Sequence, residues 1–211
     1  MARGSARLQV AFDVEDSSRT IELAPLVGRF ASRVEVGTPL IYRFGVELVR
    51  RVCPDLVLVA DFKVADAGEH EAAIAFEAGA DVVTVLGCAD DATVRGGLAA
   101  ARAHHRMVMV DLLGVADPVR RARELAALGV DELCVHTGVD RQAQGDDPLT
   151  PLRRVRGAVE VPLAVAGGIG MATIGAALEA GADIVVVGRS VTQAADPPAA
   201  ARALAAALGT G

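Results

Sequence analysis

The sequence predicts an α/β fold, a single-domain (β/α)8 TIM barrel, in a chain of 211 residues. Short apolar runs recur along the chain, helical segments lie between them, and one helix–turn–strand segment occurs twice nearly unchanged. Eight such units in a chain of this length are typical of a compact barrel. A doubly wound open sheet is the alternative. The number of strands and the lack of a Gly-x-Gly-x-x-Gly turn after the first strand weigh against that sheet.

Eight apolar runs are predicted to be the strands. Aliphatic and β-branched residues dominate them, as expected of parallel strands that are covered on both faces. In chain order they are Leu8–Phe12, Val34–Val36, Leu56–Ala60, Val82–Leu86, Met107–Val110, Leu133–Val135, Leu163–Ala166 and Ile184–Val187. We expect residues 8–211 to form the barrel and residues 1–7 to be a disordered N-terminus.

Segments rich in Ala, Glu and Arg lie between these runs and have helical spacing. The clearest are Gly68–Ala78, Pro118–Leu128, Met171–Ala180 and Pro198–Leu208. Proline at the start of two of them fits the first turn of a helix. Gly79, Gly129 and Gly181, which follow three of them, fit helix C-termini. The repeated segment, 76–83 and 178–185, joins a helix end, a glycine turn and a strand start.

Composition and charge exclude several classes of function. The net charge is −6 and no basic run is longer than Arg120-Arg121, so we expect no nucleic-acid or membrane partner. No apolar run approaches the roughly 18 residues of a membrane span, and the polar N-terminus does not resemble a signal peptide. Cys53, Cys88 and Cys134 lack metal-type spacing and favour a reducing compartment. We therefore expect a cytoplasmic protein.

Ionisable side chains stand at the C-terminal ends of the predicted strands. Asp13, Asp61, Asp111 and His136 each close a strand, and Glu35 lies within the second strand. In a barrel these ends converge on one face, which is where enzymes of this fold place their active sites. Because charged side chains are rarely buried without a partner or a function, this arrangement favours an enzyme.

The segment from Asp61 to Asp66 is the most informative motif. It places two carboxylates and the amine of Lys63 within six residues at a predicted strand exit. Such groups can hold a cation, position a proton and shift each other's pKa values. Glu35 and Asp61 are candidate ligands of a hard divalent cation. The alternatives are a surface loop with a helix N-cap for the motif, and compensation by Lys63 for the two carboxylates.

Glycines after the seventh and eighth strands indicate a phosphate site. Gly167 and Gly168 follow one strand, and Gly188 and Arg189 follow the next. Glycine lets backbone N–H groups approach an anion, a helix N-terminus adds its dipole, and arginine can add a charge-assisted contact. The glycines alone would be read as simple turn formers. Their pairing with Arg189 in this fold favours phosphate binding.

His136 is the histidine best placed for proton transfer. A histidine at a strand end is often only structural, but this one shares a face with Lys63 and several carboxylates. Its ordinary pKa suits proton transfer at neutral pH. The other histidines, His70, His104 and His105, lie in helical segments and are expected to face solvent.

Together these motifs resemble the orotidine-monophosphate-decarboxylase-type barrels, and within them the branch of 3-hexulose-6-phosphate synthase and 3-keto-L-gulonate-6-phosphate decarboxylase. The resemblance extends from Leu8 to about Leu208. It rests on the segments 8–13 (LQVAFD), 34–39 (VEVGTP), 60–68 (ADFKVADAG), 83–90 (VTVLGCAD), 136–143 (HTGVDRQA) and 165–169 (VAGGI). Of these, only the Asp-x-Lys-x-x-Asp motif is specific on its own.

The resemblance implies a role for each candidate residue. Glu35 and Asp61 would bind Mg²⁺, Lys63 would stabilise negative charge on a cis-enediolate intermediate, and His136 would move protons. Asp66 would reach across a homodimer interface into the partner's site. We thus assign Asp61, Lys63, Asp66, Asp111 and His136 to catalysis, and Asp13, Glu35, Gly167, Gly168, Gly188 and Arg189 to binding of a sugar phosphate.

Within this branch the resemblance favours a synthase. Asp111 stands where the decarboxylases typically carry Glu, and Val139 stands where they carry Arg. The synthase would condense D-ribulose 5-phosphate with formaldehyde. The decarboxylase remains the alternative because Gly188-Arg189-Ser190 resembles its phosphate loop. A non-catalytic sugar-phosphate sensor is disfavoured because the implied catalytic set is complete.

Overall fold

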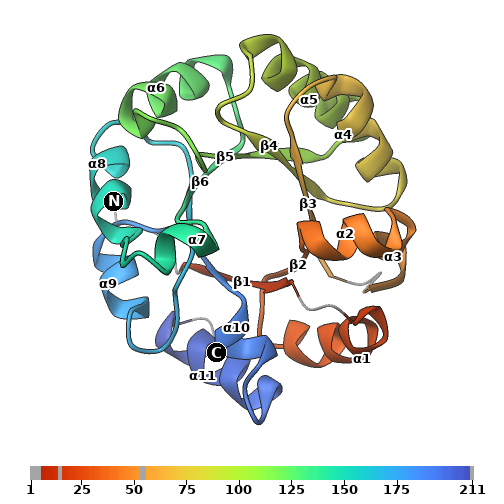
Figure 1. Cartoon of the computed structure of the whole chain (residues 1–211), viewed down its shortest axis with the longest axis vertical. Helices are drawn as coiled ribbons and strands as arrows, with labels where there is room; N and C mark the ends of the chain where they lie inside the picture. Colours follow the sequence, from red (N-terminus) through yellow and green to blue (C-terminus); the bar gives the residue numbers. More distant parts are fainter. Residues whose placement is uncertain (1–5, 14–15, 53–55, 210–211) are drawn as a thin grey trace.

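The computed structural model describes residues 6–13, 16–52 and 56–209. Within these ranges the chain forms a closed barrel of parallel strands in the order β1 to β8, and β8 pairs with β1. Figure 1 looks along the barrel, with the strands in the centre and the helices around them. The predicted (β/α)8 barrel is therefore confirmed, and the open sheet is excluded.

Each predicted apolar run overlaps one strand. The strands are β1 (Arg7–Phe12), β2 (Arg33–Val36), β3 (Leu58–Val64), β4 (Val82–Leu86), β5 (Met107–Asp111), β6 (Glu132–His136), β7 (Leu163–Ala166) and β8 (Ile184–Val187). The helices are α1 (Ser17–Gly28), α2 (Thr38–Phe44), α3 (Glu47–Val52), α4 (Gly68–Glu77), α5 (Asp91–His104), α6 (Pro118–Leu128), α7 (Val139–Gln142), α8 (Leu149–Arg156), α9 (Ile174–Glu179), α10 (Arg189–Thr192) and α11 (Pro197–Ala207).

Some boundaries differ from the prediction. β3 continues to Val64, so Asp61 lies inside this strand and does not close it. The polar residues extend β3 because a register shift between Ala60 and Val64 accommodates them. The segment 171–180 is helical only over 174–179. The expected disorder of residues 1–7 falls largely outside the described residues, and Arg7 is already the first residue of β1.

The repeated sequence segment has a structural role. Asp81, which precedes β4, accepts the backbone N–H of Leu58 at 2.8 Å, and Asp183, which precedes β8, accepts that of Leu163 at 2.9 Å. Asp131, which precedes β6, repeats this contact with Val108 at 2.8 Å. Each aspartate thus joins the start of one strand to the start of the strand before it.

Polar layers lie at both ends of the barrel interior. Its middle is filled by a separate cluster of buried side chains from every strand except β2: Ala11, Val59, Val82, Met109, Cys134, Ala164, Ala166, Ile184 and Val186. β2 contributes Arg33 and Glu35 instead, and both are buried. The N-terminal end holds Arg33 with Glu132, and the C-terminal end holds the predicted site residues.

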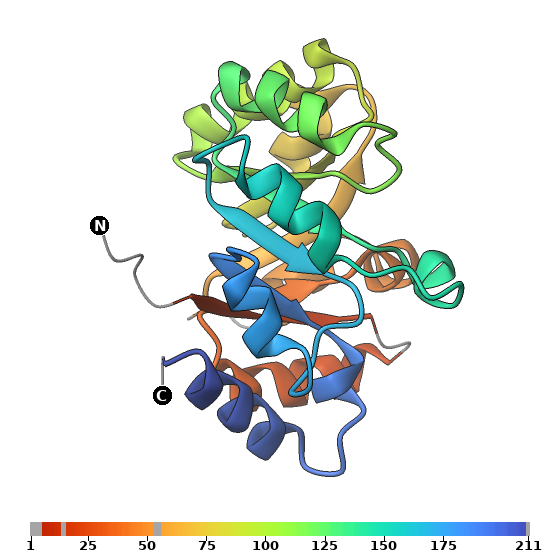
Figure 2. The ribbon, with the colours of Figure 1, turned by 90° about the vertical axis from the view of Figure 1, so that its left-hand side faces the viewer.

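The strands run across Figure 2 toward the side where α7 lies, so α7 stands at the C-terminal mouth of the barrel. The buried apolar faces of the outer helices pack around the strands and form the main core. In the part of the chain that the structure describes, every helix is too short or too polar to cross a membrane.

Candidate active site

Four predicted catalytic side chains form one network at the C-terminal mouth. Lys63 Nζ pairs with Asp61 Oδ2 and lies 3.6 Å from Asp111 Oδ2. The same Asp111 oxygen is 2.8 Å from Nδ1 of His136. Because β3, β5 and β6 point to the same end of the barrel, residues far apart in the sequence meet here. The structure therefore brings these four residues together, and their catalytic roles stay predictions.

Lys63 is the only lysine in the chain. Burial alone would lower the pKa of Lys63, but the charges of Asp61 and Asp111 and its hydrogen bond to Asp61 outweigh burial and raise this pKa. The side chain is only 21% exposed. The site therefore holds a fixed ammonium ion at neutral pH, which is suited to stabilise negative charge on a bound molecule.

His136 and Asp111 form a pair suited to proton transfer. Burial alone would lower the pKa of His136, but the hydrogen bond and the charge of Asp111 outweigh it and raise this pKa. Burial would raise the pKa of Asp111, yet its hydrogen bond to His136 and the charges of His136 and Lys63 lower it. The bond occupies Nδ1 of the imidazole and leaves Nε2 to exchange a proton with a bound molecule.

Negative charge is in excess beside Lys63. Burial raises the pKa of Glu35 well above its usual value, and the charges of Asp61 and Asp13 add to this effect. Burial and the charge of Asp61 likewise raise the pKa of Asp13, against the opposing charges of Lys63, His136 and Arg189. A hard cation with oxygen ligands would offset this excess, so the donor set fits the predicted divalent ion.

The described residues do not form a complete metal cage, because no group of three or more Asp, Glu, His or Cys side chains converges on one point. Glu35 Oε2 accepts from Nε2 of Gln9, and both carboxylate oxygens of Asp61 are hydrogen-bonded. A cation here would take one or two carboxylates and complete its shell with water and substrate oxygens. This manner of binding is typical of Mg²⁺.

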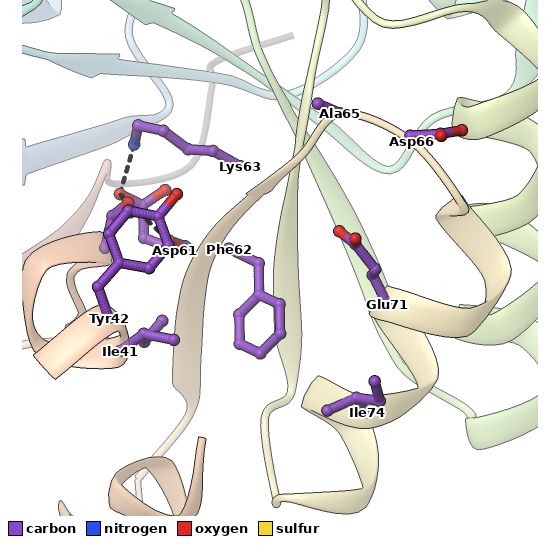
Figure 3. A pocket seen from close by; sticks show the side chains of 10 residues that line it. Ile41, Tyr42, Asp61, Phe62, Lys63, Ala65, Asp66, Glu71 and Ile74 are labelled. Atoms are coloured by element: carbon purple, nitrogen blue, oxygen red, sulfur yellow. Dashed lines mark hydrogen bonds and ion pairs between the residues drawn. The ribbon is translucent and has the colours of Figure 1, made fainter. Parts of the chain in front are cut away.

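Asp66 does not join the network within this chain. Its Oδ1 accepts the N–H of Ala67 at 2.7 Å, and Figure 3 shows its side chain turned away from Lys63. A cavity of about 480 Å³ is lined by Tyr42, Phe62 and Ile74 as well as by the acidic residues Asp61, Asp66 and Glu71. Tyr42 is 81% exposed at its rim. The catalytic role predicted for Asp66 is therefore untested by a single chain.

A second cavity, of about 520 Å³, lies at the ends of β7 and β8 and is lined by Gln142, Gly167, Gly168, Thr173 and Arg189 among others. A Cβ on Gly167 would come within 2.1 Å of the carbonyl oxygen of Thr137, and Gly167 and Gly168 have φ values of 99° and 71°. Glycine is thus required for the approach of this loop to its neighbours. Gly167, Gly168 and Arg189 come together around this cavity, whereas the predicted Gly188 is not among the residues that line it.

Several polar residues of the site were not predicted from the sequence. Thr38 and Thr84 each donate a hydrogen bond to Asp61, at 2.8 Å. Gln142 donates to the carbonyl of Thr137 at 2.7 Å and accepts from Arg189 at 3.3 Å. A signal existed for Thr84 and Gln9, since each is the polar residue at an inward position of an apolar run. A further signal in the sequence for the importance of the predicted Lys63 was that the chain has no other lysine.

Comparisons with known proteins agree with this geometry. The model of the orotidine 5'-phosphate decarboxylase / HUMPS family matches residues 6–204. The 3-hexulose-6-phosphate synthase of Mycobacterium gastri is 45% identical over 205 residues, which cover 96% of this chain and 99% of that protein.

Comparison with solved structures points to the same family. The crystal structure of 3-hexulose-6-phosphate synthase from Salmonella typhimurium is 36% identical with a TM-score of 0.93, and the match covers 97% of this chain and 100% of the other. The 3-keto-L-gulonate-6-phosphate decarboxylase from Vibrio cholerae is 25% identical with a TM-score of 0.84, over 97% of this chain and 99% of the other. From the family match and these relatives together, we conclude that the chain belongs to the orotidine 5'-phosphate decarboxylase / HUMPS family.

Proposed function

We propose that the chain is a 3-hexulose-6-phosphate synthase, which joins D-ribulose 5-phosphate to formaldehyde by aldol condensation. The single observation that carries the proposal is the Lys63–Asp111–His136 network, which combines a fixed cation and a proton-transfer group at one barrel mouth. The glycine-lined cavity beside Arg189 supplies an anion site at the same mouth. The relatives that share 45% and 36% identity and carry this name support the choice of substrate.

In the proposed reaction His136 acts first as a base. Its Nε2 takes a proton from C1 of D-ribulose 5-phosphate, and the charge of the resulting cis-enediolate lies on oxygens that Lys63 stabilises. The electron pair at C1 then forms a carbon–carbon bond to formaldehyde, and the ketone at C2 re-forms. The oxygen of formaldehyde becomes an alkoxide and takes up the proton from His136. Asp111 keeps the imidazole oriented and supports its protonated form.

A covalent Schiff-base route is disfavoured. Such a route needs a neutral lysine amine to attack the ketone. Lys63 is the only lysine in the chain, and the carboxylates around it raise its pKa. The amine is therefore protonated at neutral pH, and its role in the proposed reaction is electrostatic.

Glu35 and Asp61 are the residues that would hold Mg²⁺. When bound, the cation would supply further positive charge for the substrate oxygens. The bound cation would also relieve the mutual repulsion of Asp13, Glu35 and Asp61 within the protein. The raised pKa values of Asp13 and Glu35 support this assignment.

We further propose that the protein acts in the cytoplasm as a homodimer with shared sites. The exposed apolar side chains of Tyr42 and Ile74 line the cavity next to Lys63 and Asp66, which supports a subunit interface there. In such a dimer Asp66 would serve the site of the partner, which accords with its orientation away from Lys63 in its own chain.

The alternative function is decarboxylation of 3-keto-L-gulonate 6-phosphate to L-xylulose 5-phosphate and CO₂. One observation favours it: Arg189 lines the anion cavity, as the resemblance to the decarboxylase phosphate loop implies. An arginine at this place changes how the phosphate is held and leaves the reacting carbons unaffected. The identity of 25% to the decarboxylase against 45% to the synthase also favours the synthase.

A paired assay tests the proposal. One arm supplies D-ribulose 5-phosphate, formaldehyde and Mg²⁺ and follows formaldehyde loss, and the other supplies 3-keto-L-gulonate 6-phosphate and follows CO₂ release. We expect formaldehyde loss that EDTA abolishes. Release of CO₂ alone would favour the alternative. A Lys63→Ala variant should still bind D-ribulose 5-phosphate while turnover falls by about 10²–10³-fold, which separates an enzyme from a sugar-phosphate sensor.

A further inference from the structure

The backbone of β3 is irregular where it carries the site. Ala60 pairs with Val83 and Val64 pairs with Val85, so four steps along β3 oppose two steps along β4. Lys63 lies in this bulge with a φ of 48°, in the left-handed region that is unfavourable for a residue with a side chain. Such a conformation persists only where the surrounding structure determines it.

Thr84 on β4 occupies the gap opposite the bulge. Its Oγ1 accepts a hydrogen bond from the backbone N–H of Lys63 at 2.9 Å and donates one to Oδ1 of Asp61 at 2.8 Å. The side chain of Thr84 is buried. One hydroxyl group therefore joins the strained backbone of the lysine to the carboxylate that its ammonium contacts.

Thr38 also bonds to Asp61, but unlike Thr84 it does not bond to Lys63 in the described part of the chain. The hydroxyl of Thr38 lies within hydrogen-bond distance of Oδ2 and of the backbone carbonyl of Asp61. Within those residues Thr84 is the side chain that bonds to both members of the pair. A hydroxyl is required because the same atom accepts one hydrogen bond and donates another, which valine cannot do.

We propose that Thr84 is a positioning residue, which holds Lys63 in its left-handed conformation and fixes the carboxylate of Asp61. It touches no reacting atom. By setting the backbone of Lys63 it directs the ammonium toward Asp61 and Asp111, and so determines where positive charge meets the substrate. Its relevance to turnover rests on the proposed function, whereas its effect on Lys63 does not.

The unique lysine allows a direct test. Protein labelled with ¹⁵N only in lysine gives one backbone amide signal, that of Lys63. In the wild type this amide should exchange slowly with solvent. In Thr84→Val its exchange should accelerate by about tenfold or more, and in Thr84→Ser, which keeps the hydroxyl, it should stay within about threefold of the wild type. An unprotected amide in the wild type, or equal protection in Thr84→Val, would overturn the proposal.

Kinetics test the catalytic consequence. Thr84→Val should lower kcat by about 10- to 100-fold with little change in the KM for D-ribulose 5-phosphate, and Thr84→Ser should restore most of kcat. Thr20→Val is the matched control, since Thr20 is a buried threonine on α1 whose hydroxyl bonds only to the carbonyl of Asp16 among the described residues. Equal losses in Thr84→Val and Thr84→Ser, or none in either, would refute positioning by the hydroxyl.

The two failures are distinguishable. If the wild type is inactive in both arms of the paired assay, the proposed function fails while the amide measurement still decides the role of Thr84. If Thr84→Val does not fold, exchange of the Lys63 amide is compared between Thr84→Ala and the wild type, and this comparison decides the role of Thr84 in the same way. The Lys63 amide signal reports on the local environment of this residue. A general loss of stability would not selectively change the exchange rate of this one amide.

Discussion

Arg33 on β2 and Glu132 on β6 form a bidentate ion pair across the N-terminal end of the barrel, with N–O distances of 2.7 and 2.9 Å. The two strands are opposite each other in the closed order of eight. Both side chains are almost fully buried, and Arg7 on β1 adds a third hydrogen bond to Glu132 at 3.0 Å. This pair closes the end of the barrel that lies away from the site.

Removal of one partner of this pair should be costly. Glu132→Gln leaves Arg33 buried without a counter-charge, so we expect the free energy of unfolding to fall by about 3–5 kcal/mol. Glu124→Gln is the control, because it removes a surface partner of Arg120 and Arg121 and should cost less than about 1 kcal/mol. Urea unfolding of both variants measures the difference. Similar costs would mean that the pair contributes little to stability.

The unique lysine gives a test of the non-covalent route. Borohydride added with D-ribulose 5-phosphate should leave the mass of the protein unchanged, because a protonated Lys63 forms no Schiff base. The measurement is intact-protein mass spectrometry with and without substrate. A substrate-dependent mass gain located at Lys63 would contradict the electrostatic role of its ammonium.

His136 predicts the pH dependence of activity. Because Asp111 outweighs burial and raises the pKa of His136, kcat/KM should rise with pH through an apparent pKa above the usual value of about 6.5. In Asp111→Asn the burial effect is no longer outweighed, so this limb should move to lower pH while kcat falls. A limb that stays in place in Asp111→Asn would show that another group sets it.

The same pair has a consequence for stability. A raised pKa in the folded state means that the His136 contribution is fully present below about pH 6.5 and is lost as pH rises through the folded value. Asp111→Asn should therefore flatten the pH dependence of the free energy of unfolding in this window. Urea unfolding at several pH values, with the exposed His70 replaced by Gln as the control, measures this effect.

The phosphate assignment predicts a change in KM. Arg189→Ala should raise the KM for D-ribulose 5-phosphate by about 10- to 100-fold, the value of one charge-assisted contact, with a smaller effect on kcat. Arg120→Ala, an exposed arginine on α6, should leave KM unchanged. Steady-state kinetics decide between these outcomes, and an unchanged KM in Arg189→Ala would place the phosphate elsewhere.

Glu35 predicts an effect of metal on stability. Since its pKa is raised, the ionised carboxylate destabilises the folded state as pH rises above the usual range of a glutamate. Without metal, Glu35→Gln should therefore raise Tm by roughly 3 °C or more, whereas the exposed control Glu22→Gln should not. Mg²⁺ should raise the Tm of the wild type but not that of Glu35→Gln. A Tm increase of equal size in both proteins would place the cation away from Glu35.

The sequence predicted the parts of the site that depend on chain direction. In a parallel barrel every strand carries its last residue to the same mouth, so Asp111 and His136 could be grouped without knowledge of packing. Gly167 and Gly168 could be placed at the same mouth for the same reason, because they follow the end of β7, and they were predicted there as residues whose backbone N–H groups can approach an anion.

The features that could not be predicted depend on contacts between residues of different strands. The bulge in β3 could not be foreseen, because a register shift arises from the fit of two strands and leaves no periodic signal in either one. Thr84 could not be paired with Asp61 from the sequence because the two residues lie 23 positions apart on neighbouring strands, and only the bulge brings the hydroxyl of Thr84 to Lys63. The Arg33–Glu132 pair joins residues 99 positions apart, and nothing local indicates their contact.

The proposed function depends on removal of a proton from C1 of a pentulose phosphate at this site, and hydrogen exchange at that carbon tests this step most directly. D-Ribulose 5-phosphate would be incubated in D₂O with the enzyme and Mg²⁺ but without formaldehyde, and C1 followed by proton NMR. We predict enzyme-dependent replacement of one C1 proton by deuterium, slowed by about 10²-fold or more in His136→Gln. If both C1 protons persist while the same enzyme consumes formaldehyde when it is added, the proposed enediolate route is contradicted.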